Sequence, residues 1–146
     1  MKTAAHILKS KAIQTIHVIA PEASVFDAVK LMAEENIGAL LVMEGSKVVG
    51  LVTERDYARK IALMSRSSKE TRVREVMTSE VLYVRPERTS DECMALMTEN
   101  RVRHLPVMDG DKVLGIISIG DMVKDIISEQ QFIIQQLERY ISGERG

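Results

Sequence analysis

Residues 21–56 read PEASVFDAVKLMAEENIGALLVMEGSKVVGLVTERD, and residues 86–121 read PERTSDECMALMTENRVRHLPVMDGDKVLGIISIGD. At an offset of 65 residues the two stretches align without a gap, and the opening prolines, the turn glycines and most apolar positions coincide. Self-similarity at a fixed period is the sequence signature of a repeat architecture. The chain is therefore predicted to be a tandem duplication.

Each copy has the same predicted order of elements. A short β-branched run, at 16–19 and again at 81–84, ends near a proline, which cannot donate to a sheet ladder. Ser24 and Thr89 are predicted N-caps of the helices that follow. Two apolar runs around a glycine turn then predict a buried hairpin, followed by a second helix. The predicted fold class is α/β (α+β), with two β-α-β-β-α repeats related by a pseudo-two-fold axis around one core.

The repeats and the tail set the expected domain boundaries. We expect a single module over 1–146 that contains repeat 1, a polar exposed linker, repeat 2 and an extended C-terminal helix, at 8–64, 65–72, 73–128 and 129–146. Apolar residues recur at helical period in the tail up to Gly143, for longer than a repeat requires. This excess apolar stripe predicts a partner helix from a second subunit, and hence a homodimer.

Charge and cysteine content argue against several classes of function. The chain has 146 residues, with 20 Lys and Arg against 21 Asp and Glu, so neither nucleic acid nor an anionic membrane is expected as a partner. Cys93, the only cysteine, permits no intramolecular disulfide, and we expect it to be a small buried helix residue. No signal peptide or membrane span is indicated, and a cytoplasmic location is expected. Lys9 and Lys11 are expected on solvated faces.

A hydroxyl residue followed three positions later by a carboxylate begins the last predicted helix of each copy. These pairs are Thr53 with Asp56, and Ser118 with Asp121. One interpretation is a structural N-cap, which contributes about 1 kcal/mol. The other is a ligand site, in which the helix start holds a phosphate and the carboxylate accepts hydrogen bonds from both hydroxyls of a ribose. The spacing alone does not choose between them.

From about Leu8 to Asp125 the sequence resembles the cystathionine-β-synthase (CBS) domain, and the tandem resembles a stand-alone Bateman module of small bacterial CBS-pair proteins. The resemblance rests on the strand and proline opening, the Arg103-His104-Leu105-Pro106-Val107-Met108-Asp109 segment, the Val-x-Gly before the last strand and the closing Thr/Ser-x-x-Asp. It implies clefts between the repeats that bind adenosyl ligands such as AMP, ADP, ATP, NAD or S-adenosylmethionine. Catalytic cofactors are not expected.

Carried onto this sequence, the resemblance assigns a role to each candidate residue. Asp56 and Asp121 would bind ribose, and Thr53 and Ser118 would bind phosphate. The adenine would lie among aliphatic side chains and backbone groups, which suits a chain with 3% aromatic residues. The residues assigned to this pocket are Ile16, Val81, Ile37, Gly38, Val102 and Arg103.

The two copies differ in the charges near the expected ligand. Arg55 lies inside the first motif, whereas Arg103 and His104 belong to the second copy. If the pseudo-two-fold brings opposite copies together, these cations could converge on one polyphosphate. Our hypothesis is that the sites are unequal and that the Asp56 site, helped by Arg103 and His104, is the tighter.

The leading functional interpretation is a non-enzymatic module that binds an adenine nucleotide and signals to an unidentified effector protein through a conformational or dimer change. Neither a nucleophile with its base nor a metal-binding set is visible in the sequence, so an enzyme is not expected. The alternatives are a dimerisation scaffold with vacant clefts, or the regulatory subunit of an enzyme.

Overall fold

The computed structural model describes residues 2–11 and 15–143 and has mixed α and β content, as predicted. The chain divides into two compact units. Unit 1 contains the described residues of 1–14, 83–109 and 113–146, and unit 2 contains 15–82 and 110–112.

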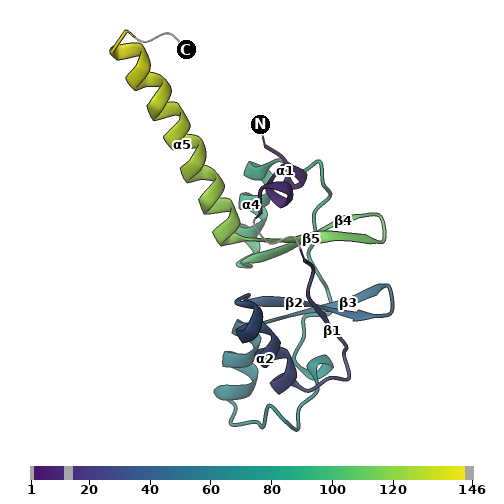
Figure 1. Cartoon of the computed structure of the whole chain (residues 1–146). Coiled ribbons are helices and arrows are strands. Elements are labelled where there is room, and N and C mark those ends of the chain that lie inside the picture. Colours follow the sequence, from purple (N-terminus) through teal and green to yellow (C-terminus); the bar gives the residue numbers. More distant parts are fainter. Residues whose placement is uncertain (1, 12–14, 144–146) are drawn as a thin grey trace. The chain divides into compact units, whose positions relative to one another are not determined.

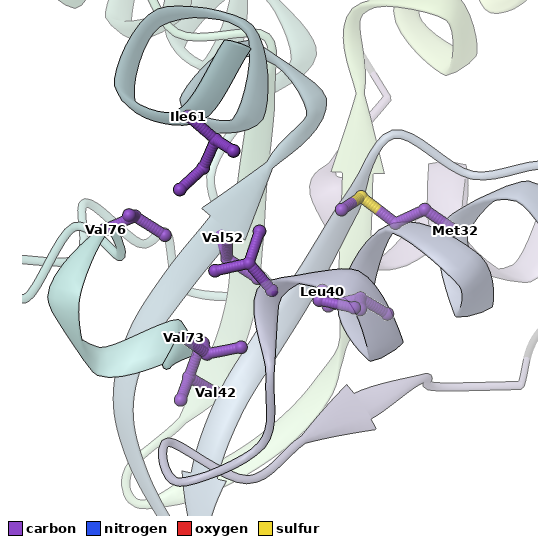
Figure 2. Packing of buried hydrophobic residues seen from close by; sticks show 9 residues of the cluster. Met32, Leu40, Val42, Val52, Ile61, Val73 and Val76 are labelled. Carbon is purple, nitrogen blue, oxygen red and sulfur yellow. The ribbon is translucent and has the colours of Figure 1, made fainter. Parts of the chain in front are cut away.

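Unit 2 is built on a three-stranded sheet of order β1-β2-β3 (Figure 1). Strands β1 and β2 are parallel, and β2 and β3 form the predicted antiparallel hairpin. Its elements are β1 (Val18–Ile19), α2 (Val25–Glu35), β2 (Ala39–Glu44), β3 (Lys47–Thr53), α3 (Glu54–Tyr57), the π-helical η1 (Ala58–Ala62) and the 3-10 helix η2 (Val73–Glu75). Side chains from α2, both hairpin strands, η1 and the η2 region meet in one apolar cluster (Figure 2).

Unit 1 repeats this arrangement with a smaller sheet and a longer last helix (Figure 1). Its elements are α1 (Ala4–Ser10), α4 (Ser90–Asn100), β4 (His104–Asp109), β5 (Lys112–Ser118) and α5 (Ile119–Ile141). Cys93 is fully buried on α4, as predicted. Helix α5 has 23 residues, which confirms the expected helical extension.

The strand predicted at 81–84 is wrong in extent. Only Val84 forms a bridge, parallel to Val107, with its N–H donating to the Pro106 carbonyl oxygen at 2.9 Å. The next steps of a parallel ladder would use the N–H groups of positions 106 and 86, and both are proline. In the first copy Leu41 stands where the second has Pro106, and β1 forms, although over Val18–Ile19 rather than 16–19.

The helix at the start of each repeat packs against the other repeat. Helix α1 lies at the start of repeat 1, yet the Ala4 N–H donates to the Arg88 carbonyl oxygen at 2.8 Å in unit 1. Likewise η2 belongs to repeat 2, yet the Val73 N–H donates to the Ala23 carbonyl oxygen at 2.8 Å in unit 2. The compact units are therefore divided differently from the repeats of the sequence.

The expectation of a wholly exposed linker is wrong at its end. Thr71 is 4% exposed. Its hydroxyl donates to the Ser67 carbonyl oxygen at 2.7 Å, and its own carbonyl oxygen accepts from the Val25 N–H at 2.8 Å. Burial is tolerated because both polar groups have hydrogen-bond partners.

Candidate functional site

In unit 2 the Thr53–Asp56 motif forms a closed set of hydrogen bonds at the start of α3. The Asp56 carboxylate accepts from the Thr53 N–H at 2.9 Å and from its hydroxyl at 3.2 Å. The Thr53 Oγ1 accepts in turn from the Asp56 N–H at 3.2 Å. This is a capping box, which satisfies backbone donors that the helix start would otherwise leave unpaired.

Lys60 is a member of this site that the sequence reasoning missed. Its ammonium lies 3.1 Å from Asp56 Oδ1 and donates to the Val76 carbonyl oxygen at 2.7 Å. The spacing of four residues was an available signal, because residues four apart lie side by side on a helix.

The structure brings Gly38, Ile37 and Ile16 to the same end of the sheet as Thr53. The Gly38 carbonyl oxygen accepts from the Glu54 N–H at 3.0 Å, and Ala39 pairs with Thr53. Because Val18 pairs in parallel with Leu41, residues just before β1 lie near the start of β2. Ile16 lies there and is 36% exposed, while Ile37 and Gly38 are half-buried.

In unit 1 the Ser118–Asp121 motif forms the same capping box at the start of α5. Asp121 Oδ2 accepts from the Ser118 N–H at 2.8 Å, and Ser118 Oγ accepts from the Asp121 N–H at 3.1 Å. The Arg103 carbonyl oxygen accepts from the Ile119 N–H at 2.9 Å, as Gly38 does for Glu54 in unit 2. The two motifs thus have equivalent geometry although the residues between hydroxyl and carboxylate differ.

Lys11 completes the Asp121 site, and its expected place on a solvated face is wrong. The Lys11 ammonium lies 3.0 Å from Asp121 Oδ2 and donates to the Ile116 carbonyl oxygen at 2.8 Å. Burial raises the pKa of Asp121, but Ser118 and Lys11 together outweigh burial and hold that pKa below its ordinary value. No sequence signal connects Lys11 with a carboxylate 110 positions away.

His104 belongs to the same electrostatic environment. It is half-buried, and burial is the largest cause of a lowered pKa at this imidazole. The positive charges of Lys11 and Arg103 lower the pKa further, whereas Asp121 raises it. Val102 is half-buried and Arg103 is exposed in the turn that leads into β4.

The remaining predicted site residues lie in unit 2. Arg55 is exposed on α3, and Val81 is half-buried. Since Arg103 and His104 belong to unit 1, their convergence with Arg55 on one phosphate stays a prediction, as does the enclosure of an adenine by Val81.

A second charged pair ties the N-terminal segment to α5. Asp125, 8% exposed, lies 2.6 Å from the Lys2 ammonium, and this hydrogen bond raises the pKa of Lys2. Asp125 stands where the first copy has Lys60, so the charge at this position is reversed between the copies. The cation that faces each helix start comes from η1, which directly follows α3, in unit 2 and from the N-terminal segment in unit 1.

In the described parts of the chain, no cluster of three or more His, Cys, Asp or Glu side chains could bind a metal ion. Among the same residues, no helix is both long and apolar enough to span a membrane.

Comparison with known proteins gives a consistent result. The family model of the CBS domain matches twice, at residues 5–63 and 73–128. A candidate signal-transduction protein with CBS domains from Burkholderia ambifaria MC40-6 is 58% identical, with a TM-score of 0.85 over 88% of this chain and 96% of that one. The hexameric CBS-CP12 protein from bloom-forming cyanobacteria is 34% identical, with a TM-score of 0.75 over 84% of this chain and 70% of that one.

Among curated proteins, the mitochondrial CBS domain-containing protein CBSX3 of Arabidopsis thaliana is 44% identical over 125 residues, which are 82% of this chain. An uncharacterized 33.4 kDa protein of Thermofilum pendens is 38% identical over 104 residues, 70% of this chain. The chain spans 61% and 34% of the lengths of these two relatives.

Proposed function

Because this chain belongs to the CBS domain family, whose paired domains are typically regulatory, we propose that it is a non-enzymatic module that binds adenine nucleotides. The ligand class is AMP, ADP, ATP or NAD, and the candidate contacts are the two hydroxyl–carboxylate motifs. Signalling would pass to an effector protein through a change in conformation or assembly.

The observation that carries this proposal is the repetition of one geometry in both units. Each motif places a carboxylate beside a hydroxyl at a helix start, and the side chains of Asp56 and Asp121 are 13% and 21% exposed. An ordinary N-cap requires neither the carboxylate nor the lysine that faces it. A partly exposed carboxylate can still accept hydrogen bonds from ribose hydroxyls.

The cations of unit 1 support a ranking opposite to the sequence-based hypothesis. The positive charges of Lys11 and Arg103 both act on the His104 imidazole, in the region that contains Asp121, whereas Asp56 is paired with Lys60. A phosphorylated ligand is attracted to a concentration of positive charge. We therefore propose that the Asp121 site binds the nucleotide more tightly than the Asp56 site.

Isothermal titration calorimetry of the full chain with AMP, ADP, ATP and NAD tests both statements. We expect saturable binding that falls at least tenfold in Asp121→Asn and less in Asp56→Asn. Asp27→Asn is the matched control, because Asp27 is also the third residue of a capped helix. A larger loss in Asp56→Asn would reverse the ranking, and an equal loss in Asp27→Asn would remove both motifs from the proposal.

The second candidate is a scaffold that binds no ligand. It is favoured by the hydrogen bonds and lysine partners that already occupy both carboxylates. A thermal-shift series distinguishes the two, since a ligand that binds only the folded chain must raise the melting temperature. No shift with any of the four nucleotides would favour the scaffold.

Self-association fits either function, and the cyanobacterial CBS-CP12 relative is hexameric. The homodimer, the cytoplasmic location and the role as regulatory subunit of an enzyme stay predictions. Sedimentation of the full chain tests the first, and co-purification of an enzyme from the native source tests the last.

A further inference from the structure

Helix α5 has an apolar face that unit 1 does not cover. Met122 and Asp125 are buried in unit 1, and from Ile126 to Ile141 every residue is exposed. In Figure 1 the second half of the helix extends away from the rest of unit 1. Nine large aliphatic and tyrosine side chains on this face are 37–83% exposed: Ile119, Val123, Ile126, Ile127, Ile133, Ile134, Leu137, Tyr140 and Ile141.

This face has the spacing of a helical bundle. Core positions recur at alternating steps of four and three, which defines a heptad with a and d positions in the usual notation. The a positions are Val123, Gln130 and Leu137, the d positions are Ile119, Ile126, Ile133 and Tyr140, and the e positions include Ile127, Ile134 and Ile141. A face of this regularity fits a partner that is itself a helix.

The width of the face indicates more than one partner helix. A two-stranded coiled coil needs an apolar seam at a and d only, whereas helices in a bundle core add e or g. Here isoleucine occupies e in three successive heptads. Isoleucine at d, as at Ile126 and Ile133, also shifts preference from dimers to trimers and tetramers.

Gln130 and the charges around the face favour other copies of α5 as these partners. Among the a, d, e and g positions of α5, Glu129 alone is charged, so identical helices meet little repulsion. Gln130 is the one polar core position and lies at the centre of the helix. Its amide is satisfied in a bundle core when it faces the same residue of another copy, which sets the register.

The available area is sufficient for a stable assembly. Each of the nine exposed side chains contributes on the order of 100 Å² of accessible surface. The face therefore offers more than the roughly 800 Å² per partner that specific interfaces bury. We propose that α5 joins four copies of this chain into a helical bundle through its a, d and e positions, with the Gln130 residues in register. This is a larger assembly than the homodimer expected from the sequence, and it does not depend on nucleotide binding.

Sedimentation equilibrium of the full chain and three variants at equal concentration tests the proposal. We expect the wild type to have four times the 16.4 kDa chain mass. Leu137→Glu and Gln130→Glu place charges in the bundle core and should reduce the mass below four chains. Gln131→Glu makes the same chemical change one residue outside the face and should keep the mass of four chains.

The single buried thiol reports whether each variant is folded. Cys93 is 0% exposed, so it should stay unreactive toward a thiol reagent in every variant that keeps the fold. A wild-type mass of three chains or fewer would overturn the four-helix assembly. So would a Leu137→Glu variant that keeps the mass of four chains, or a folded Gln131→Glu variant that loses it.

Discussion

Asn36 and Arg101 occupy equivalent positions in the two copies, and each follows the last turn of a helix in the left-handed conformation. Their φ angles are 55° and 54°. Asparagine tolerates this region, whereas other side chains with a Cβ meet steric strain there. The second copy therefore carries local strain that the first avoids.

We expect Arg101→Asn to stabilise the protein by about 0.5–1 kcal/mol, because asparagine removes part of the steric cost of the left-handed conformation. Urea unfolding measures the change. The reciprocal variant, Asn36→Arg, should destabilise by a similar amount. If both substitutions shift the midpoint in the same direction, the strain argument is wrong.

The stability of the fold should depend on the protonation of His104. Burial lowers the pKa of this imidazole below its ordinary value of 6.5, so the folded state favours the neutral form. The contribution of neutral His104 to the stability of the folded state is complete above pH 6.5 and is lost as the pH falls toward the lowered pKa of the folded state. In thermal melts at pH 7.5 and 5.5, His104→Asn should lose less stability than the wild type on acidification. An equal loss of stability in the variant and the wild type would exclude His104 as the source of the pH dependence.

At the scale of elements, helix starts were predictable and strand lengths were not. Ser24, Thr53, Thr89 and Ser118 all cap the helices that were expected after them. An N-cap depends on residues within one turn, so a local pattern is sufficient. A strand depends on a distant partner, and Pro106 shortened the ladder at Val84 from the opposite strand.

The contact between the N-terminal segment and α5 should set the acid stability. Lys11 helps to hold the pKa of Asp121 below its ordinary 3.8, so this contribution is present above that value and is lost as the pH falls through the lower folded pKa. Lys11→Met should therefore move the acid-unfolding midpoint, followed by circular dichroism, to higher pH. Lys9→Met, on the same segment, serves as control, and an equal shift there would contradict the specific role of Lys11.

At the scale of the whole molecule, α1 packs in unit 1 and η2 packs in unit 2, and this placement decides which unit responds to a mutation in either helix. Ile7 lies at the start of repeat 1 in sequence but is 1% exposed within unit 1. We expect Ile7→Ala to cost about 2–5 kcal/mol. Hydrogen exchange should rise mainly in 83–109 and 113–141. A rise in hydrogen exchange confined to 15–82 would contradict the packing of α1 in unit 1.

The candidate site was predictable where it depends on residues within one helical turn, and not where it depends on distant residues. Thr53 with Asp56, and Ser118 with Asp121, could be found because each pair lies within one helical turn. No local sequence pattern indicates that the carbonyl oxygens of Gly38 and Arg103 accept hydrogen bonds from the Glu54 and Ile119 N–H groups. Those contacts arise only when the hairpin closes.

By itself the sequence determined the duplication, the order of elements in each repeat, the helix caps and the apolar stripe of the last helix. These features depend on spacing along the chain, which is visible in one dimension. Only the tertiary structure decided that Lys11 faces Asp121, that Lys2 faces Asp125, and that α1 completes unit 1. These contacts join residues more than 80 positions apart, and no local pattern specifies which distant surface a segment will bury.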